Sequence, residues 1–150
     1  MHYKHILLPN DGSELSRKAE KECTAFAKST GARVTVLHVV SHFHLSMQPW
    51  GAPRSVHTKI EKEHEEDATN AAQTMISAIT ARIKAEGVKC DGLVVVGDQP
   101  FEEIVNSAQK CKCDLIMMAS HGRRGLDGIL LGSETQKVLT HTKIPVLVVK

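Results

Sequence analysis

The chain has 150 residues, 41% of them hydrophobic, with 19 basic and 17 acidic side chains and a formal net charge of +2. This length suits a single domain over residues 1–150 with a sizeable core, while the hydrophobic content argues against disorder and the charge against a nucleic-acid-binding surface. No apolar run approaches the roughly 20 residues of a membrane span, and the first apolar segment is too short for a signal peptide, so we expect a soluble, cytoplasmic protein that binds neither membrane nor nucleic acid.

Five short apolar runs rich in β-branched residues alternate with segments of helical spacing. The runs cover His5–Pro9, Val34–Val40, Leu93–Val96, Asp114–Ala119 and Val146–Val149. They lack polar alternation, which is typical of strands buried on both faces. The apolar spacing of helices is found in Leu15–Phe26, Ala72–Ile83, Phe101–Ala108 and Thr135–Thr142. This alternation predicts an α/β domain with a doubly wound, five-stranded parallel sheet and helices on both faces.

Polar residues and a proline mark the starts of three of these helices. Asp11 or Ser13 can cap the first helix, and Asp98 followed by Pro100 can open the third. Residues 133–136 have the Ser-x-x-Gln pattern of a capping box, which predicts that the last helix begins there.

Ligands of such sheets bind beyond the carboxyl ends of the strands, so the residues after the strands are the candidates for a site. Asp11, after the first strand, can accept hydrogen bonds from ribose hydroxyls or can serve only as a helix cap. The loop after the fourth strand contains Gly122, Gly125, Gly128 and Gly132. Such glycines allow positive φ or close approach of the main chain to a ligand, and with the helix N-terminus that follows they predict a phosphate cradle. Ordinary turn chemistry is the alternative explanation.

The stretch from residue 41 to 59 has no clear assignment. Four histidines lie in it or beside it, namely His38, His42, His44 and His57. They could bind a transition metal, but we expect no carboxylate or thiolate close by. We favour a mobile loop over the mouth of the crevice, with Met47 and Trp50 packing on the domain or contacting a partner. The charged run 59–67 fits the first turns of the second helix.

The loop after the fourth strand offers polar groups but no recognisable catalytic set. It has no G-x-x-x-x-G-K-[ST] phosphate loop and no clear pair of base and nucleophile. Arg123 and Arg124 could pair with phosphate oxygens or could be solvated surface residues. The role of His121 could be limited to orienting the loop through a backbone hydrogen bond. We therefore expect no more than slow hydrolysis. The four cysteines, Cys23, Cys90, Cys111 and Cys113, lack the paired C-x-x-C spacing of a zinc site and are expected to be reduced thiols.

Four segments resemble the universal stress protein family in their order and spacing. They are Leu7–Glu14, Val36–Val39, Ser120–Ser133 and Ile144–Val149. The likeness covers nearly the whole chain and is weakest at residues 41–59. It implies a flavodoxin-like domain with strand order 3-2-1-4-5 that is usually dimeric and, in one branch, binds ATP. On this resemblance we expect a stress-response regulator or switch that binds ATP, with Mg²⁺. The alternatives are an interaction module without nucleotide and a weak adenine-nucleotide hydrolase.

The nucleotide-binding branch of this family carries the motif Gly-x₂-Gly-x₉-Gly-(Ser/Thr). This chain has Gly122, Gly132 and Ser133 at those intervals but Ala119 in place of the first glycine. The extra methyl would matter only if that position needs a left-handed backbone or touches phosphate. By analogy, Asp11 would contact ribose. Pro9, Asn10 and Val39 would flank adenine. Gly122, Gly132 and Ser133 would hold phosphates. The complete implied site consists of Pro9, Asn10, Asp11, Val39, Met118, Ala119, His121, Gly122, Arg123, Gly132, Ser133 and Glu134.

The last apolar run, Val146–Val149, lies at an open edge of the sheet in the strand order that the resemblance implies. An exposed apolar edge with unpaired amides and carbonyls invites association. Antiparallel pairing with the same edge of a second copy would satisfy both rows of groups, so we expect a homodimer. A preceding loop that covers this edge in a monomer is the alternative.

Overall fold

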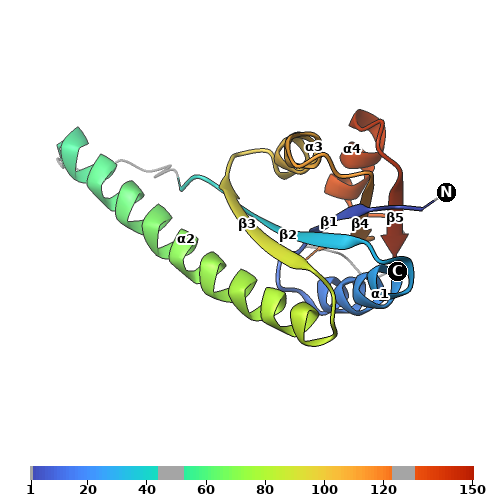
Figure 1. Cartoon of the computed structure of the whole chain (residues 1–150). Helices are drawn as coiled ribbons and strands as arrows, with labels where there is room; N and C mark the ends of the chain where they lie inside the picture. The colour runs from blue at the N-terminus through green and yellow to red at the C-terminus, as the bar shows by residue number, and fades with distance from the viewer. Residues whose placement is uncertain (1, 44–52, 123–130) are drawn as a thin grey trace.

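The structure is a computed structural model that describes residues 2–43, 53–122 and 131–150. Its elements are β1 (His5–Pro9), α1 (Glu14–Thr30), β2 (Arg33–Val40), α2 (Arg54–Ala85), β3 (Cys90–Val96), α3 (Pro100–Lys110), β4 (Leu115–Ala119), α4 (Ser133–His141) and β5 (Val146–Val149). The strands form one parallel sheet in the order β3-β2-β1-β4-β5, as predicted. Helices α1 and α2 cover one face of the sheet, and α3 and α4 cover the other (Figure 1). Compared with the predicted ranges, β2 and β3 begin earlier and β4 begins one residue later.

Successive residues of each strand face opposite helical layers. Ile6 and Leu8 of β1 lie in the core cluster on the α1–α2 side, whereas Leu7 lies in the cluster on the α3–α4 side. All five residues of β4 are buried, and so are the first four of β1. Burial on both faces explains why these strands appear in the sequence as continuous apolar runs. The same alternation decides which face is reached by side chains just beyond each strand.

The starts of α1 and α3 were predicted with unequal success. Ser13 caps α1, because its hydroxyl accepts a hydrogen bond of 3.1 Å from the Ser16 N–H. Pro100 is the first residue of α3, as predicted. The cap residue of α3 is Gln99, however, and its own side chain makes no capping hydrogen bond, so the capping role expected of Asp98 is wrong.

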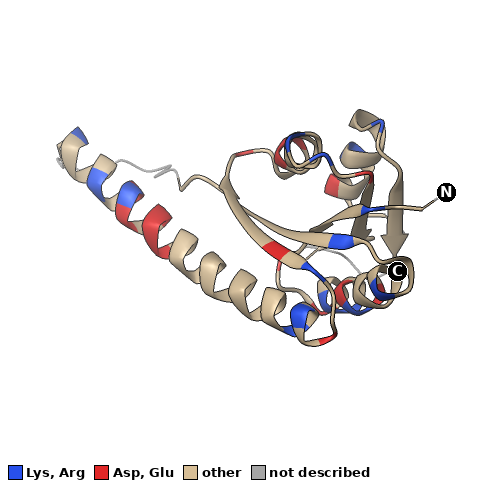
Figure 2. Ribbon diagram, in the orientation of Figure 1, with Lys and Arg blue, Asp and Glu red and all other residues tan. Residues whose placement is uncertain are grey.

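Helix α2 begins earlier than predicted and extends beyond the sheet. It starts at Arg54, so residues 54–59 are helical rather than part of the expected loop. Its first half projects away from the rest of the domain, with basic residues towards its tip and acidic residues next along the helix (Figures 1 and 2). Ion pairs one turn apart, Lys59–Glu63 and Lys62–Glu66, lie on this half. Its buried residues begin only at Ala72, so the first half is helical with little help from the core.

Candidate functional site

The loops after β1 and β4 meet at the carboxyl edge of the sheet, where the chain turns to opposite faces. Gly122 lies so close to Asp11 that a Cβ atom on residue 122 would overlap the Asp11 Oδ2 atom. Neither Gly122 nor Gly132 has a positive φ. Of the two roles expected for these glycines, the described structure therefore requires close approach and not a left-handed backbone.

A network of short hydrogen bonds holds the Asp11 carboxylate in place. Its Oδ1 atom accepts from the Ser13 N–H at 3.0 Å and from the Ser16 hydroxyl at 2.7 Å. The turn is closed by Gly12, which has φ 77° and donates its N–H to Asn10 Oδ1 at 2.8 Å. Asp11 thus supports the cap residue Ser13 without being the cap itself. Its carboxylate is fixed at the edge of the crevice.

Strand β2 continues past the point where β1 leaves the sheet. The last ladder contact between them is the Asn10 N–H donating to the Leu37 carbonyl at 2.8 Å. Residues two apart in a strand direct their main-chain groups to the same side, so Val39 presents its N–H and C=O on the β1 side, beyond the end of β1. Val40 faces β3 instead, where its carbonyl accepts from the Gly97 N–H at 2.9 Å. Val39 therefore offers a donor and an acceptor next to Asp11.

The N-terminus of α4 is fastened to the end of β4. The Gly132 N–H donates to the Ser120 carbonyl at 2.6 Å, and a Cβ on residue 132 would lie 3.0 Å from the Cα of His121. The Thr135 hydroxyl donates to the Ala119 carbonyl at 3.1 Å. These contacts set the start of α4 directly behind the loop that contacts Asp11.

The capping box predicted at residues 133–136 is wrong. Gly132 is the cap residue and has no side chain to accept a hydrogen bond. The side-chain amide of Gln136 donates to the Leu131 carbonyl and not to the cap residue. The first hydrogen bond of the helix runs from the Gln136 N–H to the Gly132 carbonyl. Among the described residues, the amides of 133–135 have no hydrogen-bond partner. Such open amides at the positive end of a helix are suited to binding an anion.

Two predicted site residues are engaged elsewhere in the fold. Glu134 accepts the Phe101 N–H at the start of α3 at 2.9 Å and also pairs with Lys137 at 3.1 Å. The carboxylate of Glu134 therefore joins α4 to α3. His121 Nδ1 lies 3.3 Å from the side-chain hydroxyl of the neighbouring Ser120.

The remaining predicted residues lie in the core or outside the described residues. Met118 is buried in the core on the α3–α4 side, and the Ala119 methyl is buried on the α1–α2 side. Ala119 lies within β4 and is not left-handed, so the departure from the family glycine introduces no backbone strain. Ser133, the first residue of α4, is exposed, and Pro9 is half-buried. Arg123 lies outside the described residues, as do Arg124, Gly125 and Gly128.

Sequence reasoning did not identify Gly12, Ser16 or Thr135 as supports of the site. The Asn-Asp-Gly turn at residues 10–12 is the signal that could have identified Gly12, because such turns use a left-handed glycine. The hydrogen bonds of Ser16 to Asp11 and of Thr135 to Ala119 join separate elements. No local pattern predicts them.

The possible metal site is not supported within the described residues. His42 Nδ1 lies 2.8 Å from Glu65 Oε2, and this hydrogen bond raises the pKa of His42. The expectation that no carboxylate lies near is therefore wrong, because α2 brings Glu65 back to the end of β2. The parts of the chain that the structure describes contain no cluster of three metal-ligating side chains. His44, Met47 and Trp50 lie outside them.

The four cysteines are free, as expected. Burial raises the pKa of the Cys23 and Cys113 thiols to about 12, so both stay protonated at neutral pH. In the described part of the chain, no helix is sufficiently long and apolar to cross a membrane.

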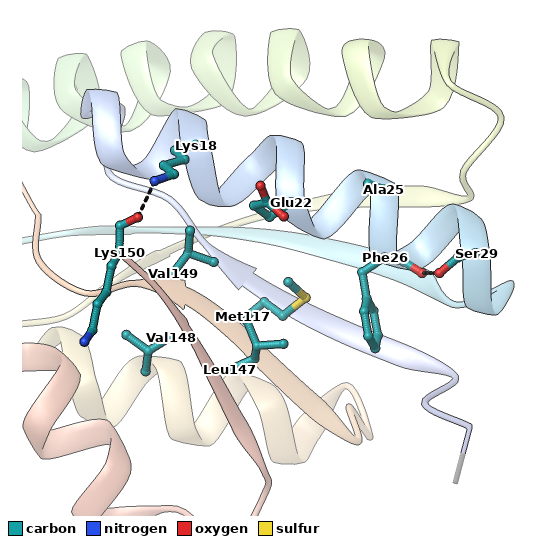
Figure 3. A pocket seen from close by; sticks show the side chains of 10 residues that line it. All are labelled: Lys18, Glu22, Ala25, Phe26, Ser29, Met117, Leu147, Val148, Val149 and Lys150. Carbon is teal, nitrogen blue, oxygen red and sulfur yellow. Dashed lines mark hydrogen bonds between the residues drawn. The ribbon is translucent and has the colours of Figure 1, made fainter.

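Strand β5 has one open edge in the described sheet. Its Val149 carbonyl accepts from the N–H of Ser120, the residue just after β4, at 2.8 Å, so the alternate residues Val146 and Val148 direct their main-chain groups away from β4. A cavity of about 590 Å³ lies beside this edge, between α1 and β5 (Figure 3). Its apolar lining includes Phe26, Met117 and Leu147.

Comparison with known proteins identifies the family. The model of the universal stress protein family matches residues 2–150. Universal stress protein MJ0577 of Methanocaldococcus jannaschii is 36% identical over 156 residues, which cover 99% of this chain and 95% of that protein. The solved structure of MJ0577 has a TM-score of 0.83 at 35% identity and covers 100% of this chain and 97% of its own.

Two more distant solved structures share the fold. A universal stress protein in complex with cAMP has a TM-score of 0.67 at 22% identity, covering 99% of this chain and 98% of its own. The universal stress protein of Archaeoglobus fulgidus in complex with dAMP has a TM-score of 0.62 at 20% identity, covering 100% of both chains. The family model covers nearly the whole chain and the relative from Methanocaldococcus jannaschii is 36% identical, so the chain belongs to the universal stress protein family.

Proposed function

We propose that this chain binds an adenine nucleotide, ATP with Mg²⁺, and acts in the cytoplasm as a stress-response regulator or switch. The observation that carries the proposal is the contact between Asp11 and Gly122. It puts a fixed carboxylate beside the loop that leads to the open amides of α4. The related structures with cAMP and dAMP support an adenine nucleotide as the ligand class.

The groups around Asp11 fit the base and sugar of such a ligand. The Asp11 carboxylate can accept hydrogen bonds from two ribose hydroxyls. The Val39 N–H and C=O form a donor and acceptor pair that matches the N1 acceptor and the amino group of adenine. Pro9 and the main chain of Asn10 border the same space, because Pro9 ends β1 and Asn10 follows it where β2 continues. A few well-placed polar groups beside apolar walls are typical of small-molecule sites.

The start of α4 fits the phosphates. Amides 133–135 have no partner among the described residues and can act as donors, and the helix dipole adds positive potential where they lie. Gly122 and Gly132 allow the main chain to pack closely around this point. Mg²⁺ is commonly held by phosphate oxygens with one or two carboxylates and water, so it needs no separate cluster of protein ligands. We propose no more than slow hydrolysis, since the chemistry would depend on positioning alone.

Calorimetric titration with ATP and Mg²⁺ tests the proposal, together with mass spectrometry of any ligand released when the purified protein is denatured. We expect saturable heat and a rise in the thermal midpoint. Absence of both at millimolar nucleotide would contradict nucleotide binding and favour an interaction module without nucleotide.

We also propose that the chain forms a homodimer through β5. The outward main-chain groups of Val146 and Val148, together with the apolar cavity beside them, support antiparallel pairing with a second copy. Sedimentation equilibrium at micromolar concentration should give a mass near twice the 16.4 kDa of one chain. The substitution Val148→Asp should shift this mass towards 16.4 kDa. Dimerisation that is unaffected by Val148→Asp would place the interface elsewhere.

A further inference from the structure

His38 lies on β2 near its carboxyl end and has no role in the site described above. The residue is half-buried, and its Nδ1 atom lies 2.8 Å from the Asn10 carbonyl oxygen. A carbonyl oxygen only accepts hydrogen bonds, so Nδ1 carries a proton and donates it to this bond. The Asn10 N–H in turn donates to the Leu37 carbonyl at 2.8 Å. Two successive residues of β2 therefore hold both main-chain groups of the residue that precedes Asp11.

The register of the sheet assigns the Asn10 carbonyl a different donor. Every second residue of β2 directs its main-chain groups towards β1, beginning with Arg33, whose N–H donates to the Lys4 carbonyl at 3.0 Å. Continued in the same register, the ladder pairs the Val39 N–H with the Asn10 carbonyl. Both residues are described, and no hydrogen bond joins these two groups. The ring of His38 therefore takes the place of the next ladder bond.

This replacement explains why Val39 has an open N–H beyond the end of β1. A buried carbonyl without a donor is unfavourable, and Asn10 is only 5% exposed. Without the ring, the Asn10 carbonyl would be satisfied best by the Val39 N–H, and the pairing of β1 with β2 would lengthen by one bond. The imidazole thus ends the ladder early and leaves the Val39 N–H to another acceptor.

We propose that His38 is a positioning residue that keeps the Val39 N–H open for the N1 atom of adenine. The inference rests on the nucleotide binding proposed above. N1 of adenine accepts a hydrogen bond, whereas N1 of guanine carries a hydrogen, so an open N–H at this place selects adenine. His38 acts through the Asn10 carbonyl and not by contact with the base.

Two substitutions separate the donor from the bulk of the ring. His38→Leu removes the donor and keeps an apolar side chain. His38→Asn is the matched control, because its side-chain amide nitrogen can donate from nearly the position of Nδ1. In amide hydrogen exchange of the free protein, the Val39 N–H of the parent and of His38→Asn should exchange faster than the Leu37 N–H, which lies within the ladder. In His38→Leu the exchange of Val39 should slow by about fivefold or more.

Calorimetry with ATP and with 1-deaza-ATP, in which a C–H group replaces N1, isolates the contact with the base. The parent and His38→Asn should bind ATP about 2- to 10-fold more tightly than 1-deaza-ATP. His38→Leu should bind both nucleotides equally to within about twofold, because its Val39 N–H is engaged by Asn10. A purely structural disturbance of the Asp11 turn would weaken both nucleotides alike and leave the ratio of their affinities unchanged.

Three outcomes would overturn the inference, and two of them appear in the parent without any variant. These two are a Val39 amide as protected as that of Leu37, and equal affinity for ATP and 1-deaza-ATP. The third is a folded His38→Leu protein that keeps the parental ratio of affinities. If the parent binds neither nucleotide but its Val39 amide exchanges rapidly, the proposed function fails, and the role of His38 in selecting the base fails with it.

Discussion

Replacing Gly122 with alanine would test whether the contact with Asp11 shapes the nucleotide site. The new Cβ would overlap Asp11 Oδ2 and would lie 3.4 Å from Asp11 Cγ. The carboxylate cannot turn away freely, because its other oxygen is held by Ser13 at 3.0 Å and by Ser16 at 2.7 Å. Gly122 is exposed and has no positive φ, so the backbone itself tolerates alanine. The expected result is a displaced carboxylate in a folded domain.

The expected loss follows from the ribose contact. A hydrogen bond to a charged group contributes about 1.5–3 kcal/mol, so losing one should raise the dissociation constant of ATP about 10- to 150-fold. Isothermal titration calorimetry measures this change. Circular dichroism and the thermal midpoint check that Gly122→Ala remains folded.

A double-mutant cycle shows whether the effect passes through Asp11. Oδ2 and Cγ of Asp11 are the described atoms within 4 Å of the added Cβ. In an Asp11→Ala background, Gly122→Ala should therefore change ATP binding by no more than about twofold. An equal loss in both backgrounds, or parental affinity of Gly122→Ala alone, would refute this account of the site.

Three further predictions concern the loop after β4 and the opposite edge of the sheet. Gly132→Val should abolish ATP binding in calorimetry and leave a folded circular dichroism spectrum, because even a Cβ there lies 3.0 Å from His121 and 3.1 Å from the Ser120 carbonyl; an unchanged dissociation constant would contradict it. Ala119→Gly should bind ATP at least as well as the parent but lower the free energy of unfolding in urea by about 1–2 kcal/mol, since a buried methyl is lost and backbone freedom is gained; a clear loss of affinity would contradict it. Burial lowers the pKa of His5 below 6.5, so the unfolded chain binds a proton at a pH where the folded chain does not. The free energy of unfolding should therefore fall as the pH drops below 6.5, and His5→Gln should flatten this dependence in urea titrations; an identical slope would contradict it.

The sheet could be predicted because its strands are buried on both faces and therefore appear in the sequence as continuous apolar runs. The ends of β1 and β5 match the predicted ranges because Pro9 and Val149 border polar residues. Alternation of strands and helices then leaves few topologies, and the resemblance to one family selects the order that the structure confirms.

The details of helix starts could not be predicted, because contacts between distant elements override local preference. Ser133 and Gln136 have the residue types of a capping box, yet Thr135 bonds to the end of β4 and Glu134 bonds to α3. These two bonds fix where α4 begins. His42 and Glu65 are 23 residues apart, and only the length of α2 brings them together. The start of α2 was missed because its first turns have almost no apolar face to mark them.

The first half of α2, which has little contact with the core, should unfold separately from the rest of the domain. A helix of 32 residues is about 48 Å long, whereas an eight-residue strand such as β2 spans only about 26 Å. Turns before Ala72 propagate from the packed half and are retained by local hydrogen bonds and ion pairs and by the contact of Glu65 with His42 just after β2, so the turns that precede Glu65 can unwind one at a time from Arg54. Heating should therefore remove helical signal gradually before the domain melts, and amide exchange should slow stepwise along α2 towards the sheet. The fold thus carries a segment whose helicity responds to conditions that leave the crevice intact.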